Sequence, residues 1–238
     1  MNPYYDIVII GGGIQGAAVA QAAAAQGYSV LLLEKTALAA GTSSRSSKLV
    51  HGGLRYLESG QFKLVAESLR ERADLLRLAP SLVKLQPFHI PVYRHTTRSP
   101  WMLRLGLSLY ALLARFGTGS GFSSVPRRQW DTLDGLSCDG LQHVFRYWDA
   151  QTDDQALTQA IMRSAQSLGA MLGCPAEFTQ AVIAKDQCDI EFRQNGQTHA
   201  CRASVLINAA GPWIEQVAPV SYTHLRAHET VLDLVCRL

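Results

Sequence analysis

Charged side chains are scarce in this sequence. Of its 238 residues only 17% are Asp, Glu, Lys or Arg, and the formal net charge is +3. No run of like charge interrupts the chain. An excess this small does not create the basic surface on which nucleic-acid binding depends, so we expect no nucleic-acid partner. The 47% apolar content and the length fit one large or two small globular domains with a core.

Paired cysteines and long apolar runs are also missing. The five cysteines are scattered and form no Cys-x-x-Cys pair, so we expect neither a metal site nor a redox dithiol. An odd, scattered set is typical of a reducing compartment, which predicts a cytoplasmic location. The N-terminal letters MNPYYD lack a basic segment ahead of an apolar one, and the run Ile7–Ile10 is too short to cross a bilayer. These features predict neither a secretory signal nor a membrane span.

A glycine turn between a β-branched strand and an alanine-rich helix is the first positive signal. Gly11, Gly13 and Gly16 fit the pattern GxGxxG, and they follow the strand Ile7–Ile10. In a dinucleotide-binding βαβ unit the first glycine allows the tight turn, the second lets the backbone approach a pyrophosphate, and the third lets the helix pack against the strand. The second strand ends at Glu34, at about the 20-residue spacing of a ribose-binding acid.

Glu34 narrows the choice of dinucleotide. A carboxylate at this place accepts hydrogen bonds from ribose hydroxyls and repels a 2′-phosphate, which favours FAD or NAD over NADP. The free N–H groups at the start of the helix face the phosphates. The alternative is a glycine-rich turn in an α/β domain that holds no ligand.

The segment Gly41–Leu57, GTSSRSSKLVHGGLRYL, points toward a flavin. Its small hydroxylated residues can approach a pyrophosphate or a flat ring closely, and Arg45 and Lys48 can offset phosphate charge. The adjacent glycines at 52 and 53 permit close backbone approach to a ring. A nicotinamide enzyme would usually continue with further short βα units instead. The alternative for the hydroxylated residues is a capped turn with a solvated lysine.

The run Thr42–Pro80 resembles the FAD-dependent glycerol-3-phosphate dehydrogenase family. The glycine-motif helix, RSPWMLRLGLSLYALL, YWDAQTDDQALTQA and VLINAAGPWIEQV resemble other blocks of that family in the right order, so the resemblance extends from Tyr5 to about Val217. It implies an α/β fold with a Rossmann-like FAD-binding domain and part of a substrate (cap) domain, a truncated DAO-type flavoprotein fold. Three helix positions depart from the family's glycine, aspartate and arginine, which bears on the exact substrate: Ala18, Ala22 and Gln26.

The resemblance also implies a layout. Residues 2–79 and 150–219 would form the FAD-binding domain, and 80–149 part of a substrate domain. We expect helices at Phe62–Leu78 and Asp154–Leu168, and strands near Thr179–Lys185, Asp189–Arg193 and Ser204–Asn208. Residues 220–238 resemble a translated sequencing adapter, so they are expected to be non-native, and the chain is expected to be an N-terminal fragment.

Roles for single residues follow from the same resemblance. His51 would take the hydroxyl proton of the substrate or hydrogen-bond the flavin. Arg55 would hold the substrate phosphate, unless it is an arginine on a helix face, and Tyr56 would close the site. Trp213 is expected to pack in the core rather than to stack on the flavin. The residues expected to contact FAD are Gly11, Gly13, Gly16, Glu34, Lys35, Thr42, Ser43, Ser44, Ser47, Lys48, Gly52, Gly53, Ala210 and Gly211.

The family reaction oxidises sn-glycerol 3-phosphate to dihydroxyacetone phosphate and passes electrons to a membrane quinone. The apolar segment Trp101–Phe116, interrupted by arginines, is expected either to lie at a membrane surface or to pack inside the substrate domain. The first case would place the enzyme peripherally on the cytoplasmic face of the inner membrane. The alternatives are a related FAD-dependent amino- or hydroxy-acid oxidoreductase, or an inactive flavin-binding fragment; we expect this 238-residue chain itself to be inactive.

Overall fold

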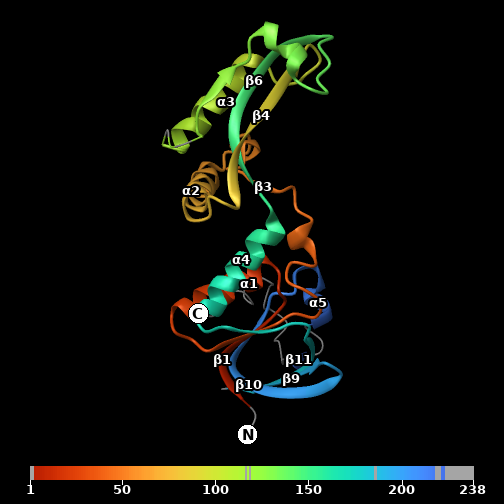
Figure 1. Ribbon diagram of the computed structural model, residues 1–238. Helices are drawn as coiled ribbons and strands as arrows, with labels where there is room; N and C mark the ends of the chain where they lie inside the picture. The colour runs from red at the N-terminus through yellow and green to blue at the C-terminus, as the bar shows by residue number, and fades with distance from the viewer. Residues whose placement is uncertain (1–2, 116, 118, 185–186, 218–220, 223–238) are drawn as a thin grey trace. The chain divides into compact units, whose positions relative to one another are not determined.

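The computed structural model describes residues 3–115, 117, 119–184, 187–217 and 221–222 (Figure 1). Two compact units make up the chain. The first combines Met1–Ser46 with Asp154–Leu238, and the second is Ser47–Asp153. We expected residues 47–79 in the cofactor domain, whereas the structure places them in the second unit, because they pack on its sheet and on α3 (Pro100–Leu113). The cofactor and substrate roles of the two units stay predictions.

The first unit is built on a seven-stranded sheet with a parallel centre. β1 lies between β10 and β2, and β7 extends the parallel part beyond β2. β8, β9 and β10 continue the sheet by antiparallel pairing. In spatial order the strands are β11 (Ser221–Tyr222), β8 (Glu177–Ile183), β9 (Cys188–Gln194), β10 (Gln197–Asn208), β1 (Tyr4–Ile10), β2 (Val30–Leu33) and β7 (Met171–Gly173).

The central strands of this sheet are buried on both faces. Ile7 and Ile9 face one cluster with the helices α1 (Ile14–Ala25) and α4 (Asp154–Ser167), while Val8 faces a second cluster on the other side. This double burial explains the unbroken β-branched run that the sequence showed. The alanines of α1 have no bulk to hold the helix away from the sheet. The helix ends where Gly27 adopts a φ of 86°, the left-handed conformation typical of a helix C-terminus.

The second unit is an antiparallel sheet with two helices along it (Figure 1). The apolar faces of both helices pack on the long strands of this sheet, around Leu69, Leu107, Tyr110 and Phe145. The elements are β3 (Leu49–Val50), α2 (Phe62–Leu78), β4 (Val83–Tyr93), α3 (Pro100–Leu113), β5 (Phe122–Ser124) and β6 (Leu141–Thr152).

Most of the expected elements outside 80–149 are confirmed. α2 has the predicted bounds, and α4 begins at the predicted Asp154. The expected short strand Ser204–Asn208 is the end of the longer β10, in which Val205 is 40% exposed. The expected non-native tail lies outside the described residues except for Ser221–Tyr222, which pair with β8. Its origin stays a prediction.

Candidate cofactor and active site

The glycine turn connects β1 to α1, and two of its glycines are required by packing. Gly11 has a φ of 108°, and a Cβ there would lie 2.6 Å from the carbonyl oxygen of Ala209. A Cβ on Gly16 would lie 1.9 Å from the carbonyl oxygen of Gly11. Gly13 is less crowded, because an added Cβ would meet only the Ser43 hydroxyl oxygen, at 3.1 Å. The turn therefore has the close helix–strand contact that the motif predicts.

Glu34 lies beside the glycine turn. Its Oε2 accepts a hydrogen bond from the Gly12 amide at 2.7 Å, and its Oε1 accepts one from the Thr36 amide at 2.8 Å. An ionised carboxylate has about four acceptor positions, so it can still accept a ribose hydroxyl. Lys35, by contrast, pairs with Glu177 of β8 at 2.9 Å and is 70% exposed. That contact lowers the pKa of Glu177 and directs the ammonium group toward β8.

The hydroxylated loop reaches the same turn. Thr42–Ser44 form a short 3-10 helix, and the Ser43 hydroxyl accepts a hydrogen bond at 2.9 Å from the amide of Ile14, the first residue of α1. Helix starts leave such amides without intrahelical partners. Ser44 donates its hydroxyl to the carbonyl oxygen of Gly41 at 3.2 Å. The loop thus contributes one hydroxyl to the helix N-terminus that the motif assigns to phosphates.

Ala210 and Gly211 follow β10 at the carboxyl edge of the parallel strands. The amide of Ala209 donates to the carbonyl oxygen of Ile10, so this segment continues alongside β1 and the glycine turn. Trp213 does not lie in the core as expected. It is 48% exposed, and its ring lies so close to Gly41 that a Cβ there would be 2.7 Å from Cζ3. Trp213 ends the short 3-10 helix Gly211–Trp213, and its ring lies against the loop at Gly41 instead of inside either core cluster of this unit.

These residues of the first unit fit the phosphate and ribose parts of a dinucleotide. The carboxyl ends of β1, β2 and β10 meet at one edge, where α1 begins, and this edge is where open α/β sheets bind ligands. The absence of side chains at Gly11 and Gly13 keeps the backbone accessible there, and Glu34 stands at the end of the second strand. The fit extends to Ser43 but not to the Lys35 ammonium, which is engaged with β8.

The remaining predicted residues lie in the second unit, between β3 and α2. His51 is exposed, Gly52 and Gly53 are buried, and Arg55 and Tyr56 lie on a 3-10 helix that spans Leu54–Leu57. Among the described residues Arg55 forms no ion pair within 4.0 Å, so its guanidinium is available to an anion. Tyr56 is 38% exposed beside it. Ser47 and Lys48 precede β3, and the Lys48 carbonyl accepts from the Thr152 amide at 2.9 Å.

The two adjacent glycines have packing reasons of their own. A Cβ on Gly52 would lie 2.4 Å from both the Leu69 Cδ2 and the Tyr110 hydroxyl oxygen. Gly53 has a φ of 71°, and its Cβ would lie 2.6 Å from the ring of Tyr56. From the sequence, both glycines were expected to allow the close approach of a flat ring. In the structure, each is also required by its protein neighbours.

A buried polar network, which the sequence did not predict, lies behind Gly52. Arg72 Nη1 donates to Asp149 Oδ1 at 2.8 Å, and the Tyr110 hydroxyl donates to Asp149 Oδ2 at 3.2 Å. Burial, and secondarily the nearby Asp149 charge, raises the pKa of Tyr110 far above its ordinary value. One signal was available: with Val65 and Leu69, Arg72 occupies the buried stripe of α2, where an arginine is unusual.

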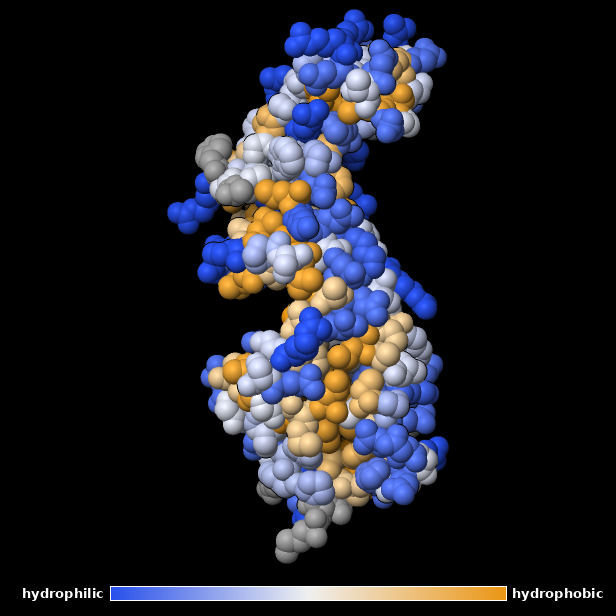
Figure 2. Space-filling model, in the orientation of Figure 1, coloured by the Kyte–Doolittle hydropathy of each residue, from blue (hydrophilic) through white to orange (hydrophobic). Residues whose placement is uncertain are grey.

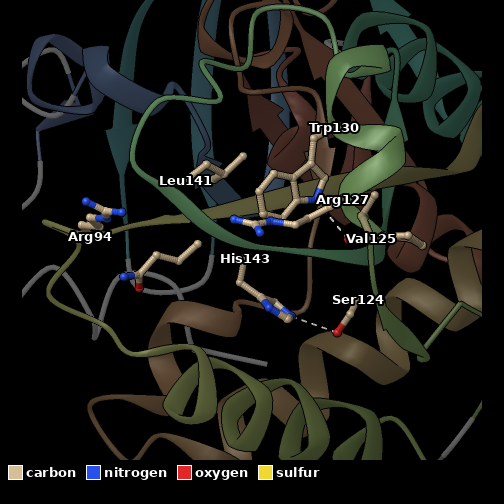
Figure 3. A pocket seen from close by; sticks show the side chains of 9 residues that line it. Arg94, Ser124, Val125, Arg127, Trp130, Leu141 and His143 are labelled. Atoms are coloured by element: carbon tan, nitrogen blue, oxygen red, sulfur yellow. Dashed lines mark hydrogen bonds between the residues drawn. The ribbon is translucent and has the colours of Figure 1, made fainter.

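The second unit also carries a basic hollow near the start of β6 (Figure 3). Arg94, Arg127 and His143 line it, and the Arg127 guanidinium lies 5.3 Å from the centroid of the Trp130 ring. Burial, together with the charge of Arg104, lowers the pKa of His143, whose Nε2 is 3.0 Å from the Ser124 hydroxyl. None of the predicted site residues lines this hollow.

Comparisons with known proteins agree with these features. The chain matches the family described as FAD dependent oxidoreductase over residues 6–233. A glycerol-3-phosphate dehydrogenase of Pseudomonas tolaasii is 40% identical over 211 residues, which are 88% of this chain and 40% of that protein. The chain thus spans well under half the length of this curated relative.

Two solved structures share the fold. The glycerol-3-phosphate dehydrogenase from Bacillus halodurans, complexed with FAD, aligns with a TM-score of 0.67 at 25% identity over 90% of this chain and 35% of its own. L-proline dehydrogenase from P. horikoshii aligns with a TM-score of 0.68 at 16% identity over 92% of this chain and 56% of its own. The second likeness concerns the fold alone.

Proposed function

The chain belongs to the FAD dependent oxidoreductase family, and from that premise we propose that the protein carrying it oxidises sn-glycerol 3-phosphate to dihydroxyacetone phosphate. FAD is the cofactor of this family. The observation that carries the proposal is the glycine turn at the edge of β1, β2 and β10, bordered by Glu34 and Ser43, in a chain 40% identical to a glycerol-3-phosphate dehydrogenase.

The residues of the first unit would hold the nucleotide part of FAD. The backbone of Gly11 and Gly13 and the start of α1 would face the pyrophosphate, and Glu34 would accept ribose hydroxyls. Thr42, Ser43 and Ser44 would line the phosphates from the other side of the turn. Gly16 would act indirectly, by letting α1 pack close to β1. Further contacts are proposed for Ser47, Lys48, Gly52, Gly53, Ala210 and Gly211, and for Lys35 through its main chain only, because its ammonium group pairs with Glu177.

The chemistry requires removal of a hydride from one carbinol carbon and of a proton from its hydroxyl group. Bound FAD supplies the hydride acceptor. We assign the proton to His51, because imidazole is the side chain best suited to exchange a proton near neutral pH and this ring is exposed. The alternative role for His51 is a hydrogen bond to the flavin. Retention of the wild-type pH profile by a His51→Asn variant would favour this alternative.

Arg55 would bind the phosphate of the substrate. A guanidinium presents donors in a fork that matches a phosphate, and Arg55 forms no ion pair with the described residues. The nearby Glu58 is held by Arg98, which lowers the pKa of Glu58 and keeps its carboxylate occupied. Tyr56, half-exposed on the same 3-10 helix, would close the site beside the phosphate.

A quinone in the membrane is the proposed electron acceptor, and α3 is the proposed membrane contact. Trp101, Leu105 and Leu112 share one face of α3 and are 66%, 60% and 57% exposed. Figure 2 shows apolar residues at the surface around α2 and α3, among hydrophilic ones. A helix of this kind, with Arg104 beside it, suits the interface of a bilayer. No described helix is long and apolar enough to span one.

Vesicle sedimentation tests the membrane contact. A Trp101→Ser, Leu105→Ser double variant of the full-length protein should lose binding to vesicles that contain anionic lipid. A matched Phe62→Ser, Leu64→Ser variant, which removes exposed apolar residues from α2, should retain it. Binding of the Trp101→Ser, Leu105→Ser variant at the wild-type level would show that α3 is not the contact.

Turnover with an artificial electron-accepting dye tests the reaction. The full-length protein should reduce the dye with sn-glycerol 3-phosphate, and far less with glycerol, which lacks the phosphate that Arg55 would bind. Proline or glycine as the preferred substrate would establish the amino-acid alternative. We expect the 238-residue chain alone to be inactive, because it spans about 40% of the length of its relative; turnover by this chain would contradict that expectation.

A further inference from the structure

Four segments of the second unit converge on the backbone amide of Gly52. This amide donates to the Tyr110 hydroxyl at 2.9 Å, and the same hydroxyl donates to Asp149 Oδ2 at 3.2 Å. Arg72 completes the chain through Asp149 Oδ1, at 2.8 Å, and also donates to the Trp148 carbonyl oxygen at 3.1 Å. α2, α3 and β6 each contribute one side chain, and the fourth segment is the loop that carries His51.

The network is fully inside the unit. Arg72, Tyr110 and Asp149 are each 2% exposed. Arg72 Nε is buried without a hydrogen-bond partner among the described residues, which costs free energy. A buried ion pair is often no more stabilising than well-packed apolar side chains of the same volume. Stability alone therefore does not account for placing this network here.

The hydrogen-bond directions in the network are determined by its charges. An ionised carboxylate only accepts, so the single proton of Tyr110 points at Asp149 and the phenol oxygen is left to accept from Gly52. Arg72, in turn, holds the carboxylate in place from the opposite side. The network therefore delivers one acceptor, in one orientation, to one backbone amide.

The hydrogen bond that holds the Gly52 amide also sets the direction of the His51 carbonyl group. The nitrogen of Gly52 lies in the same peptide plane as the carbonyl group of His51, and a trans peptide directs these two groups in opposite directions. The His51 carbonyl consequently points away from Tyr110. The plane is also confined sterically, because Leu69 and Tyr110 leave no room for even a Cβ on Gly52. The main chain of His51 is thus oriented by a hydrogen bond and by packing.

We propose that Tyr110 is a positioning residue: with Asp149 and Arg72 it sets the orientation of the His51–Gly52 peptide and so the place from which the His51 side chain acts. This inference rests on the proposed function, in which His51 handles the substrate proton. It assigns Tyr110 no contact with substrate or cofactor. Its effect is therefore expected in the chemical step rather than in substrate binding.

A pair of tyrosine variants tests the proposal in the full-length protein with FAD bound. Tyr110→Phe removes only the hydroxyl that holds Gly52. Tyr147→Phe is the matched control, because its ring lies 6.3 Å from that of Tyr110 in the same cluster and its hydroxyl makes no hydrogen bond with any described residue. Both variants lose one oxygen from the same region of the core.

Tyr110→Phe should accelerate hydrogen exchange at the Gly52 amide about tenfold, the effect of losing one buried hydrogen bond. It should lower kcat by roughly 10- to 100-fold, the scale of a small misplacement of a reacting group, while KM changes less. It should also shift the pH profile of kcat. Tyr147→Phe should leave all three measurements at the wild-type values.

Equal Gly52 exchange in the two variants overturns the proposal, and so does faster exchange without any change in kcat. If wild-type protein with bound FAD does not oxidise glycerol 3-phosphate, the proposed function fails instead; the Gly52 exchange and the flavin spectrum of the Tyr110→Phe variant then decide the positioning role. If Tyr110→Phe does not fold, 3-fluorotyrosine at position 110 keeps both hydrogen bonds but weakens the acceptor. It should change Gly52 exchange and kcat in the same directions, and no change in either would overturn the proposal.

Discussion

A Gly16→Ala substitution would place a methyl group where α1 crosses the end of β1. The new Cβ would lie 1.9 Å from the carbonyl oxygen of Gly11, whereas real Cβ contacts essentially never fall below 3.0 Å. The obstructing atom belongs to the backbone of the turn, so no side-chain rotation relieves the clash. The helix must move away from the strand, or the turn must change its conformation.

The expected cost has two parts. Overpacking of this kind lowers the free energy of unfolding by about 1–3 kcal/mol. Movement of the helix also displaces the amide of Ile14, which now donates to Ser43 at 2.9 Å, together with the other amides that would face the pyrophosphate. A loss of about 1.4 kcal/mol in these contacts weakens FAD binding about tenfold.

Urea unfolding of the apoprotein and fluorescence titration with FAD measure the two parts in the full-length protein. Gly106→Ala is the matched control. Gly106 also lies within a helix, α3, but a Cβ there meets nothing within 4 Å, so alanine should stabilise the protein by about 0.5–1 kcal/mol and leave FAD affinity unchanged. If Gly16→Ala behaves like Gly106→Ala, the close contact in the turn is not needed and the reasoning is refuted.

Three further predictions concern the second unit. Arg55→Gln should raise KM for glycerol 3-phosphate about 10- to 100-fold, the value of a charged hydrogen bond, with a smaller effect on kcat; steady-state kinetics decide, and an unchanged KM would remove Arg55 from the site. Asp149→Asn breaks a buried pair and should cost about 3–5 kcal/mol in urea unfolding, against about 0–1 kcal/mol for the exposed Asp74→Asn. Burial, with a neighbouring arginine, lowers the pKa values of His89 and His143, so the unfolded chain binds these protons more readily. The contribution of these two neutral histidines to the free energy of unfolding is therefore complete above about pH 6.5 and is lost as the pH falls below that value. Thermal unfolding at pH 7.5 and 5.5 should show that asparagine at either position reduces this loss, and an unchanged loss would contradict the assignment.

The elements β1, α1 and α2 could be predicted from short sequence patterns. The interval between Phe62 and Leu78 carries leucines at helical spacing, and α2 has these bounds. The β-branched run at Ile7–Ile10 and the glycine spacing led directly to β1, its turn and α1. In each case the signal lies within one short window of sequence.

The long strands β4 and β6 were not predicted, for a physical reason. β4 contains Pro87 and Pro91, which argue against a strand in a sheet interior. In the order β3-β6-β4 this strand lies at the edge of the described sheet, where a missing N–H is tolerated. Edge position is a tertiary property, so the sequence of β4 alone does not reveal it.

The candidate site divides in the same way. The positions of the glycine turn and of Glu34 could be predicted from the sequence, because the dinucleotide-binding motif has a fixed spacing. The contact between Ser43 and Ile14, and the network from Arg72 to Gly52, join segments far apart in the chain. Gly52 shows why such contacts cannot be predicted from the sequence. We expected a glycine there so that the cofactor could approach, whereas Leu69 and Tyr110 already leave no room for a side chain.

An anaerobic visible spectrum of the full-length protein, recorded before and after addition of sn-glycerol 3-phosphate, tests the central claim most directly. We predict a flavin absorption band that bleaches when the substrate is added, since the electrons have no other acceptor. A flavin band that persists would retain the cofactor and reject the substrate, and folded protein without a flavin band would contradict the account of the glycine turn and of Gly41–Leu57.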